Sequence, residues 1–230
     1  RRVLIAHVDI TARKRAERLS RLQHEILALV VADTPLRTTL EQLGEALELE
    51  SPGAQSAILT CTPEGDHVHL GAGPSLPSGF ADQLDGVRIP ELLHFVEGPA
   101  TADLRRLPGV TWVGAALAHS LKTLISLPIR SRSGTNLGIL CFFYRAAGSP
   151  PPHTRALLEV GASLAAAAIE RNRTARALRE RETRFNAVFA LQPDAVFTLS
   201  KLGAIASANP AAEQLLGESA SDLIRRGFAD

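Results

Sequence analysis

The sequence predicts an α+β fold, in which an antiparallel sheet carries helices packed on one face and long connector helices lie at both ends. The first observation is that segments 13–32 and 153–190 keep helical spacing of their apolar residues without a break. The second is that four short runs of strand type lie between these two segments: 55–62, 67–72, 121–129 and 137–144. The third is the turn residues between consecutive runs, which are typical of antiparallel hairpins.

The first helix is predicted over 13–32, where leucines and isoleucine recur three or four residues apart. Thr34 is placed as the N-cap of a second helix, with Pro35 at its first position. This second helix is expected over 35–48, because Ser51-Pro52-Gly53 forms a turn directly after it.

The strands should form a buried sheet beneath an irregular covering segment. Residues 73–120 are rich in Gly and Pro, and we expect only short helical pieces there, around 77–84 and 101–107. This segment should cover the sheet face that the long helices leave open. The residues expected in or near the sheet are Ala57, Leu59, Ser126, Leu127, Leu140 and Phe142.

Composition excludes several partners. The chain of 230 residues has 25 Lys and Arg against 24 Asp and Glu, a net charge of +1, so no electrostatic case exists for nucleic acid or an anionic membrane. No stretch approaches the roughly 20 apolar residues of a membrane helix, so we predict no membrane contact and a cytoplasmic location. Cys61 and Cys141 lie in apolar runs and are interpreted as small buried hydrophobes.

Two sets of motifs resemble PAS sensor domains. The tripeptide Asp9-Ile10-Thr11 followed by charged residues is similar to the end of the last strand of that family. A second set is similar to the family's opening: Arg184-Phe185, Pro193-Asp194-Ala195-Val196, Asn209-Pro210-Ala211-Ala212 and Leu216-Gly217. The resemblance implies that one complete domain lies between two PAS pieces.

The region between them resembles a GAF domain. The segments that carry the resemblance are Gln23-His24-Glu25-Ile26-Leu27, Ser126-Leu127-Pro128-Ile129, Asn136-Leu137-Gly138-Ile139-Leu140 and the helix around 164–171. Together the resemblances predict five parts of the chain: the end of a PAS domain (1–12), a linker helix (13–19), a GAF-like sensor domain (20–173), a connector helix (174–182) and the first part of a second PAS domain (183–230).

A small-molecule effector would be enclosed between the sheet and the irregular segment, because a cavity beneath loops on a rigid sheet is a common ligand site. The candidate ligand-binding residues are His94, Phe95, Trp112, His119 and Ser126. Aromatic and histidine side chains suit a planar or weakly polar molecule. No cofactor is identified; haem or another small effector stays open, and so does the alternative that Trp112 fills the core.

A homodimer through the terminal helices is predicted from a heptad-like series on the last helix. The residues assigned to the dimer seam are Leu164, Ala168, Ala175 and Leu178. Polar residues interrupt the series further along, so the alternative to a switching coiled coil is a connector helix that only dimerises.

The histidines do not form a convincing catalytic or metal-binding pattern. His24 precedes Thr34-Pro35 by too many residues to match the phosphoacceptor box of sensor kinases, and it is interpreted as a surface histidine. His67 and His69 share a strand face, but no third metal ligand is indicated. We predict no catalysis and no metal in this chain.

The first hypothesis is a GAF-type sensory and dimerisation module between PAS domains of a bacterial signalling protein. Residues 72–77 resemble a GAF subgroup found in cyclic-di-GMP enzymes and hybrid kinases, which favours a cyclic-di-GMP synthase or phosphodiesterase as output. The alternatives are the input region of a sensor histidine kinase, a ligand-free spacer that transmits helix motion, and a small haem- or metal-binding redox sensor.

Overall fold

The computed structural model describes residues 11–89, 98–107, 110–148, 151 and 153–226. The chain divides into two compact units between Asn172 and Arg173. The predicted end of a first PAS domain at 1–12 lies outside the described residues, except that Thr11 and Ala12 begin the first helix.

The first unit is built on a five-stranded antiparallel sheet with the strand order β2-β1-β5-β4-β3. The strands are β1 (Ala54–Cys61), β2 (Val68–Ala72), β3 (Ala100–Asp103), β4 (Thr123–Arg130) and β5 (Asn136–Tyr144). The two central strands, β1 and β5, pair over nearly their whole length because both are apolar on both faces. The antiparallel sheet and the six residues predicted in it are confirmed.

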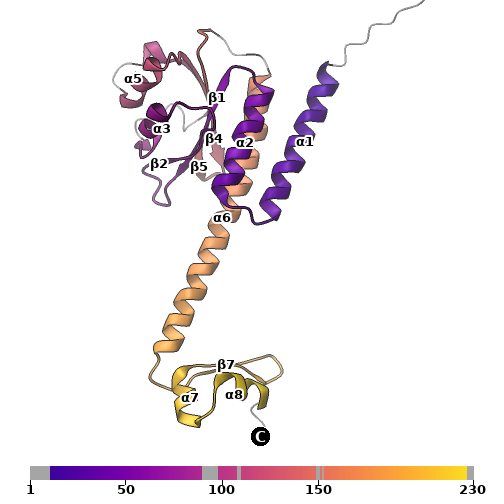
Figure 1. Ribbon diagram of the computed structural model, residues 1–230, viewed down its shortest axis with the longest axis vertical. Helices are drawn as coiled ribbons and strands as arrows, with labels where there is room; N and C mark the ends of the chain where they lie inside the picture. The colour runs from indigo at the N-terminus through magenta and orange to yellow at the C-terminus, as the bar shows by residue number, and fades with distance from the viewer. Residues whose placement is uncertain (1–10, 90–97, 108–109, 149–150, 152, 227–230) are drawn as a thin grey trace, which may run out of the picture. The chain divides into compact units, whose positions relative to one another are not determined.

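Three long helices cover one face of this sheet, as predicted (Figure 1). They are α1 (Thr11–Val31), α2 (Leu36–Glu50) and the first part of α6 (Thr154–Leu191). α2 and α6 lie next to the strands and α1 packs beside α2, and the apolar residues of all three join the sheet in one cluster that includes Ile26, Leu43, Leu140, Phe142 and Ala165 (Figure 1). The 3.6-residue spacing of the stripes therefore produces the packing that the sequence indicated.

The opposite face carries two short helices, α3 (Ser78–Leu84) and α5 (Thr111–Ala118) (Figure 1). Helix α3 was predicted from the sequence, whereas no helix was predicted at the position of α5. The predicted helical piece at 101–107 is wrong in its first half, where Ala100–Asp103 forms edge strand β3 and only Leu104–Arg106 turns as the 3₁₀ helix η2. The reason is tertiary: Ala100–Asp103 pairs with Ser126–Thr123 of β4, which outweighs the local preference.

The N-cap predicted for α2 is also corrected. Pro35, not Thr34, holds the cap position, with an extended ψ of 137°, and no side chain caps the helix there. Helical geometry begins one residue later than predicted because Pro35 has not yet entered it. At the other end of α2, Glu48 accepts hydrogen bonds from the backbone and hydroxyl of Ser56 and from the hydroxyl of Ser75. This carboxylate ties the 72–77 segment to α2 and β1.

The second unit contains the remainder of α6, a two-stranded antiparallel sheet and two short helices. Strands β6 (Phe197–Leu199) and β7 (Ile205–Ala208) form the sheet, and α7 (Pro210–Leu216) and α8 (Ala220–Arg226) follow. Asn209 is the N-cap of α7, Pro210 occupies its first turn, and Gly217 ends it in the left-handed conformation at φ 70°.

Candidate effector site and partner surface

A row of small side chains crosses the centre of the sheet on the face covered by α3 and α5. Ala57, Cys141, Ser126 and Ala100 lie opposite one another on β1, β5, β4 and β3. Directly opposed residues of antiparallel strands point to the same face. Ala57 and Cys141 belong to the core cluster of this face, so Ser126 points there too. This row of small side chains is called the floor below.

The Ser126 hydroxyl is the polar group of this floor. Ser126 is fully buried, and within the described residues its Oγ has no hydrogen-bond partner. A buried hydroxyl without a partner costs about 1–3 kcal/mol of stability, and such groups are uncommon in folded proteins. A bound molecule with a polar atom over the floor would satisfy this hydroxyl.

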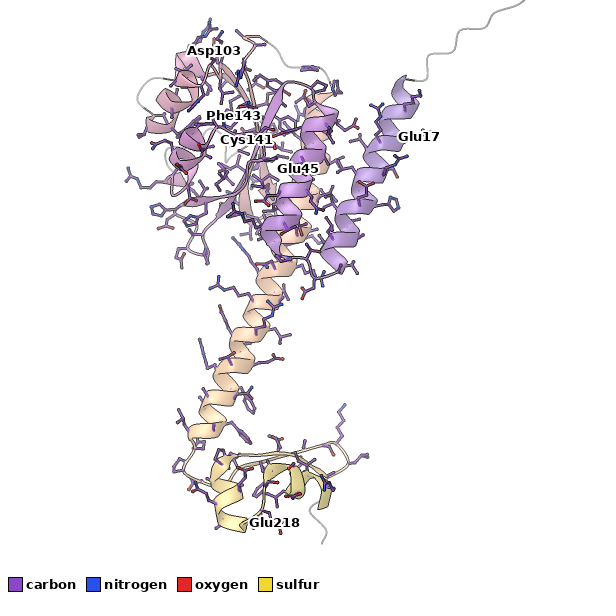
Figure 2. The ribbon with its side chains drawn as sticks, in the orientation of Figure 1. Glu17, Glu45, Asp103, Cys141, Phe143 and Glu218 are labelled. Atoms are coloured by element: carbon purple, nitrogen blue, oxygen red, sulfur yellow. The ribbon has the colours of Figure 1, made fainter. Side chains whose placement is uncertain are left out.

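An aromatic group borders the floor on one side. Phe143 lies one row away from Cys141 on β5 (Figure 2), and Phe80 of α3 meets it edge to face at 5.0 Å between ring centres. Trp112 of α5 packs edge-on against the same Phe143 at 6.3 Å. The three rings join both short helices to the sheet, so a movement of α3 or α5 would shift Phe143 beside the floor.

The predicted site residues are only partly brought together. Trp112 and Ser126 lie on the same sheet face, and Trp112 is buried as a core side chain. His119 follows the end of α5 and lies against Gly79 of α3, half-buried. His94 and Phe95 lie outside the described residues. The sequence missed Cys141, Phe143 and Phe80, although Cys141 and Phe143 show the two-residue spacing of one strand face.

The two cysteines are unsuited to covalent attachment of a ligand. Both are buried, and burial raises the pKa of the Cys141 thiol to about 12. Only the thiolate is a good nucleophile, so Cys141 stays protonated and unreactive near neutral pH. An effector on the floor would therefore bind without a covalent bond to Cys141.

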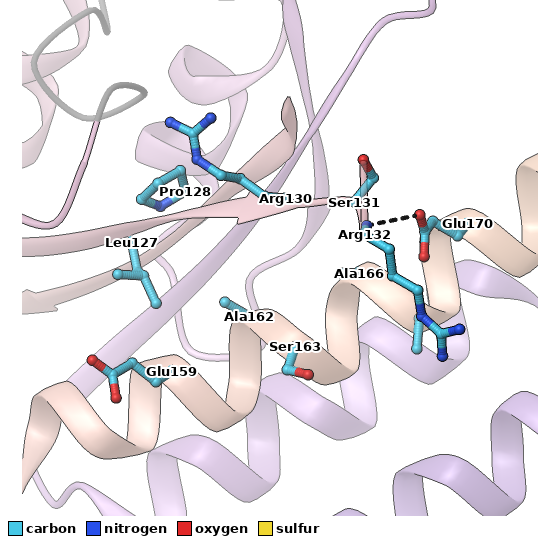
Figure 3. Close-up of a pocket in the computed structure, with 11 residues that line it drawn as sticks. Leu127, Pro128, Arg130, Ser131, Arg132, Glu159, Ala162, Ser163, Ala166 and Glu170 are labelled. Atoms are coloured by element: carbon cyan, nitrogen blue, oxygen red, sulfur yellow. Dashed lines mark hydrogen bonds between the residues drawn. The ribbon is translucent and has the colours of Figure 1, made fainter. Parts of the chain in front are cut away.

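A groove of about 490 Å³ lies between β4 and α6 (Figure 3). Leu127, Pro128 and the arginines of the β4–β5 turn line one wall, and small residues of α6 line the other. β3 pairs only with Thr123–Ser126, so within the described residues the outer edge of β4 from Leu127 onward has no strand partner. Two arginines and two glutamates line the groove, so it attracts no ion of one sign.

The predicted dimer seam is divided by the fold. Leu164 and Ala168 are only 5% and 6% exposed, because α6 packs both side chains into the core of the first unit. Little of either side chain is therefore left to contact a partner chain. Ala175 and Leu178 lie beyond the first unit, and Leu178 is 58% exposed. The second part of α6 also exposes Phe185, so the exposed apolar surface of α6 that suits a partner helix lies after Asn172.

The histidines on β2 are engaged with carboxylates. His69 Nδ1 lies 3.1 Å from Asp85 Oδ1, and His67 Nδ1 lies 3.0 Å from Asp66 Oδ2. Among the side chains that the structure describes, no three His, Cys, Asp or Glu residues gather as a metal ion requires. Nor is any described helix both long and apolar enough to cross a membrane.

Comparison with known proteins places this architecture. The phycoerythrobilin-bound GAF domain from a cyanobacterial phytochrome superposes with a TM-score of 0.53 at 14% identity, covering 69% of this chain and 97% of that domain. A domain of a protein named as a two-component sensor histidine kinase from Sinorhizobium meliloti superposes with a TM-score of 0.54 at 15% identity, covering 64% of this chain and 99% of that one. These likenesses establish the fold.

A PAS domain family model matches residues 183–230. The first unit therefore has the fold of GAF domains, and residues 183–230 are similar to the PAS domain family. A methyl sulfide methyltransferase-associated sensor from Methanosarcina acetivorans is 27% identical over 190 residues, a match that covers 79% of this chain but 19% of the relative.

Proposed function

We propose that this chain is a sensory and dimerisation module of a bacterial signal-transduction protein. The GAF domain binds a small effector over the floor between the sheet and the α3–α5 layer. Helix α6 then passes the resulting change to the PAS domain that begins at residue 183. The proposal includes the division of the chain into a linker helix (13–19), a GAF-like sensor domain (20–173) and a connector helix (174–182).

The observation that carries the proposal is the buried Ser126 hydroxyl, which lacks a partner within the described residues. A spacer that binds nothing gains from alanine at this position, because the desolvation cost of the hydroxyl is then removed. A sensor keeps the serine because its effector supplies the missing hydrogen bond. The side chains of Ala57, Cys141 and Ala100, which lie in the same row, are all small, so movement of α3 or α5 away from the sheet would open room for such a molecule.

The path from floor to output runs through α6. Its first part lies on the sheet so closely that a Cβ on Gly161 would come within 2.8 Å of Leu47 Cδ1 and 2.9 Å of Leu140 Cδ2. A shift of β5 therefore displaces the helix instead of being absorbed by loose packing. The exposed apolar residues beyond Asn172, Leu178 and Phe185 among them, would pair with the same helix of a second copy.

The output is proposed to be a cyclic-di-GMP synthase or phosphodiesterase. The supporting feature is the 72–77 segment, whose Ser75 is bound by Glu48 and whose Pro74 lies against Gly44 of α2. The second candidate is the input region of a sensor histidine kinase, which the fold likeness to the Sinorhizobium meliloti domain favours. Incubating the full-length protein separately with labelled GTP, cyclic-di-GMP and ATP separates the two. Formation of cyclic-di-GMP from GTP or hydrolysis of added cyclic-di-GMP supports the first, and phosphoryl transfer from ATP to histidine supports the second.

The sensor and spacer proposals are separated by Ser126→Ala. Trp112 is the single tryptophan and reports on this face, so a metabolite library can be screened by its fluorescence. For a sensor, Ser126→Ala should weaken the affinity of a hit by about 3- to 10-fold through loss of one hydrogen bond. A Ser163→Ala variant, exposed on α6, is the matched control and should bind normally. A library without hits would favour the spacer, and hits whose affinity is unchanged by Ser126→Ala would refute the floor as the binding site.

A further inference from the structure

One buried side chain in the second unit makes an unusual number of hydrogen bonds. Asn209 is fully buried, and its Oδ1 accepts from the backbone N–H of Val196 at 2.9 Å and of Ala212 at 3.0 Å. Its Nδ2 faces three backbone carbonyl oxygens, those of Phe189 at 3.2 Å, Gln192 at 3.3 Å and Asp194 at 2.9 Å. A single amide therefore contacts the end of α6, the segment after it, the residue that precedes β6, and α7.

The chemistry of these contacts fixes the orientation of the amide. Its oxygen meets two N–H donors and its nitrogen meets three carbonyl acceptors, so exchanging the two atoms would set like against like at every contact. Asn is the side chain with this combination at this length. Aspartate keeps the acceptor contacts and loses every donor contact, and serine keeps only the N-cap bond to α7.

The contact with Phe189 lies at a weak point of the helix. Phe189 is in the last turn of α6, where backbone carbonyls have no partner within the helix. Its neighbours in that turn do not anchor the helix by burial, since Val188 is 56% and Leu191 83% exposed. The hydrogen bonds from Asn209 therefore replace the apolar packing that would normally hold a helix end.

We propose that Asn209 is the positioning residue that fastens the end of α6 to the PAS segment, so that a displacement of the helix reaches β6 and α7. The proposal rests on the proposed function in one respect, namely that α6 transmits the signal. The amide nitrogen contacts the end of α6 and the segment after it, at Phe189, Gln192 and Asp194. The amide oxygen contacts Val196, which precedes β6, and Ala212 of α7. Asn209 joins the two sides through one rigid planar group.

The test is hydrogen exchange of backbone amides in the whole chain, without effector, for Asn209→Asp. The expected result is that amides of the last turn, 188–191, exchange at least about tenfold faster because the turn frays, while the Ala212 amide keeps its protection. This asymmetry separates a positioning role from a general structural one. Asn186→Asp is the control, because it adds the same charge on an exposed part of the same helix and should leave both groups of amides unchanged.

Two results would overturn the proposal. Unchanged exchange at 188–191 would mean that the helix end is held by other contacts, and equal loss of protection at 188–191 and Ala212 would mean that Asn209 only supports the fold. If Asn209→Asp fails to fold, Asn209→Ser is judged by the same comparison, since serine still caps α7. The effector screen on Ser126 tests the proposed function separately, so either idea can fail while the other stands.

Discussion

Gly161 and Gly114 are both glycines inside helices, but they differ in what surrounds them. A Cβ on Gly161 of α6 would lie 2.8 and 3.1 Å from the two methyl carbons of Leu47 and 2.9 Å from Leu140 Cδ2. Leu47 and Leu140 are fully buried, so their side chains cannot swing into solvent. A Cβ on Gly114 of α5 would meet nothing within 4 Å. Comparing an alanine substitution at Gly161 with one at Gly114 therefore separates the effect of close packing around α6 from the general effect of alanine in a helix.

Replacing glycine by alanine in a helix stabilises it by about 1 kcal/mol. Gly114→Ala should gain about this amount in the free energy of unfolding. Gly161→Ala should gain the same amount and lose about 1–3 kcal/mol through overpacking. We therefore expect Gly161→Ala to be destabilised by up to about 2 kcal/mol and to lie about 1–3 kcal/mol below Gly114→Ala.

Urea unfolding followed by Trp112 fluorescence measures this difference, because the only tryptophan lies in the core of the first unit. The signal then excludes the second unit, which need not unfold in the same transition. Equal stabilisation by the two substitutions would refute the close approach of α6 to Leu47 and Leu140. It would also remove the basis for coupling between the sheet and α6.

Two further predictions concern the surface. The side chain of Arg105 donates hydrogen bonds to both carboxylate oxygens of Asp103 at 2.9 and 2.7 Å, which lowers the pKa of Asp103 from 3.8 to about 2. Because the pKa of Asp103 is lower in the folded than in the unfolded chain, its ionised carboxylate stabilises the fold at pH values above the unfolded pKa, and this stabilisation is lost as the pH falls toward 2. An NMR titration of Asp103 should therefore give a midpoint near 2, and a midpoint near 4 would contradict the ion pair. Asp103→Asn should remove this part of the dependence of stability on acid pH. Light scattering at micromolar concentration should give roughly twice the 24.5 kDa chain mass for the wild type. Leu178→Glu should lower this mass, because the new charge enters the apolar seam, whereas the control Leu202→Glu, at an exposed position, should leave it unchanged. A monomeric wild type would exclude the dimer.

The sequence by itself determined the long helices and the central strands, because their patterns repeat over many residues. The spacing of Leu40, Leu43 and Leu47 and the apolar runs of β1 and β5 are local signals that few other arrangements satisfy. The motif Asn209-Pro210-Ala211-Ala212 likewise indicated the resemblance to PAS domains, and Asn209 with Pro210 marks a helix start through local capping chemistry.

Only the tertiary structure decided which residues share a site. Edge strand β3 exists because Ala100–Asp103 finds a partner in β4, a pairing between segments far apart in the sequence. The same long-range register sets Ser126 beside Cys141 and Ala57, and it is the absence of any described partner there that singles out its hydroxyl. Leu164 and Ala168 carry a heptad pattern that suits a partner chain or a core equally well. In the structure both side chains are buried in the core of the first unit. A periodic apolar stripe predicts that a helix face is covered, but it does not say which part of the protein covers it.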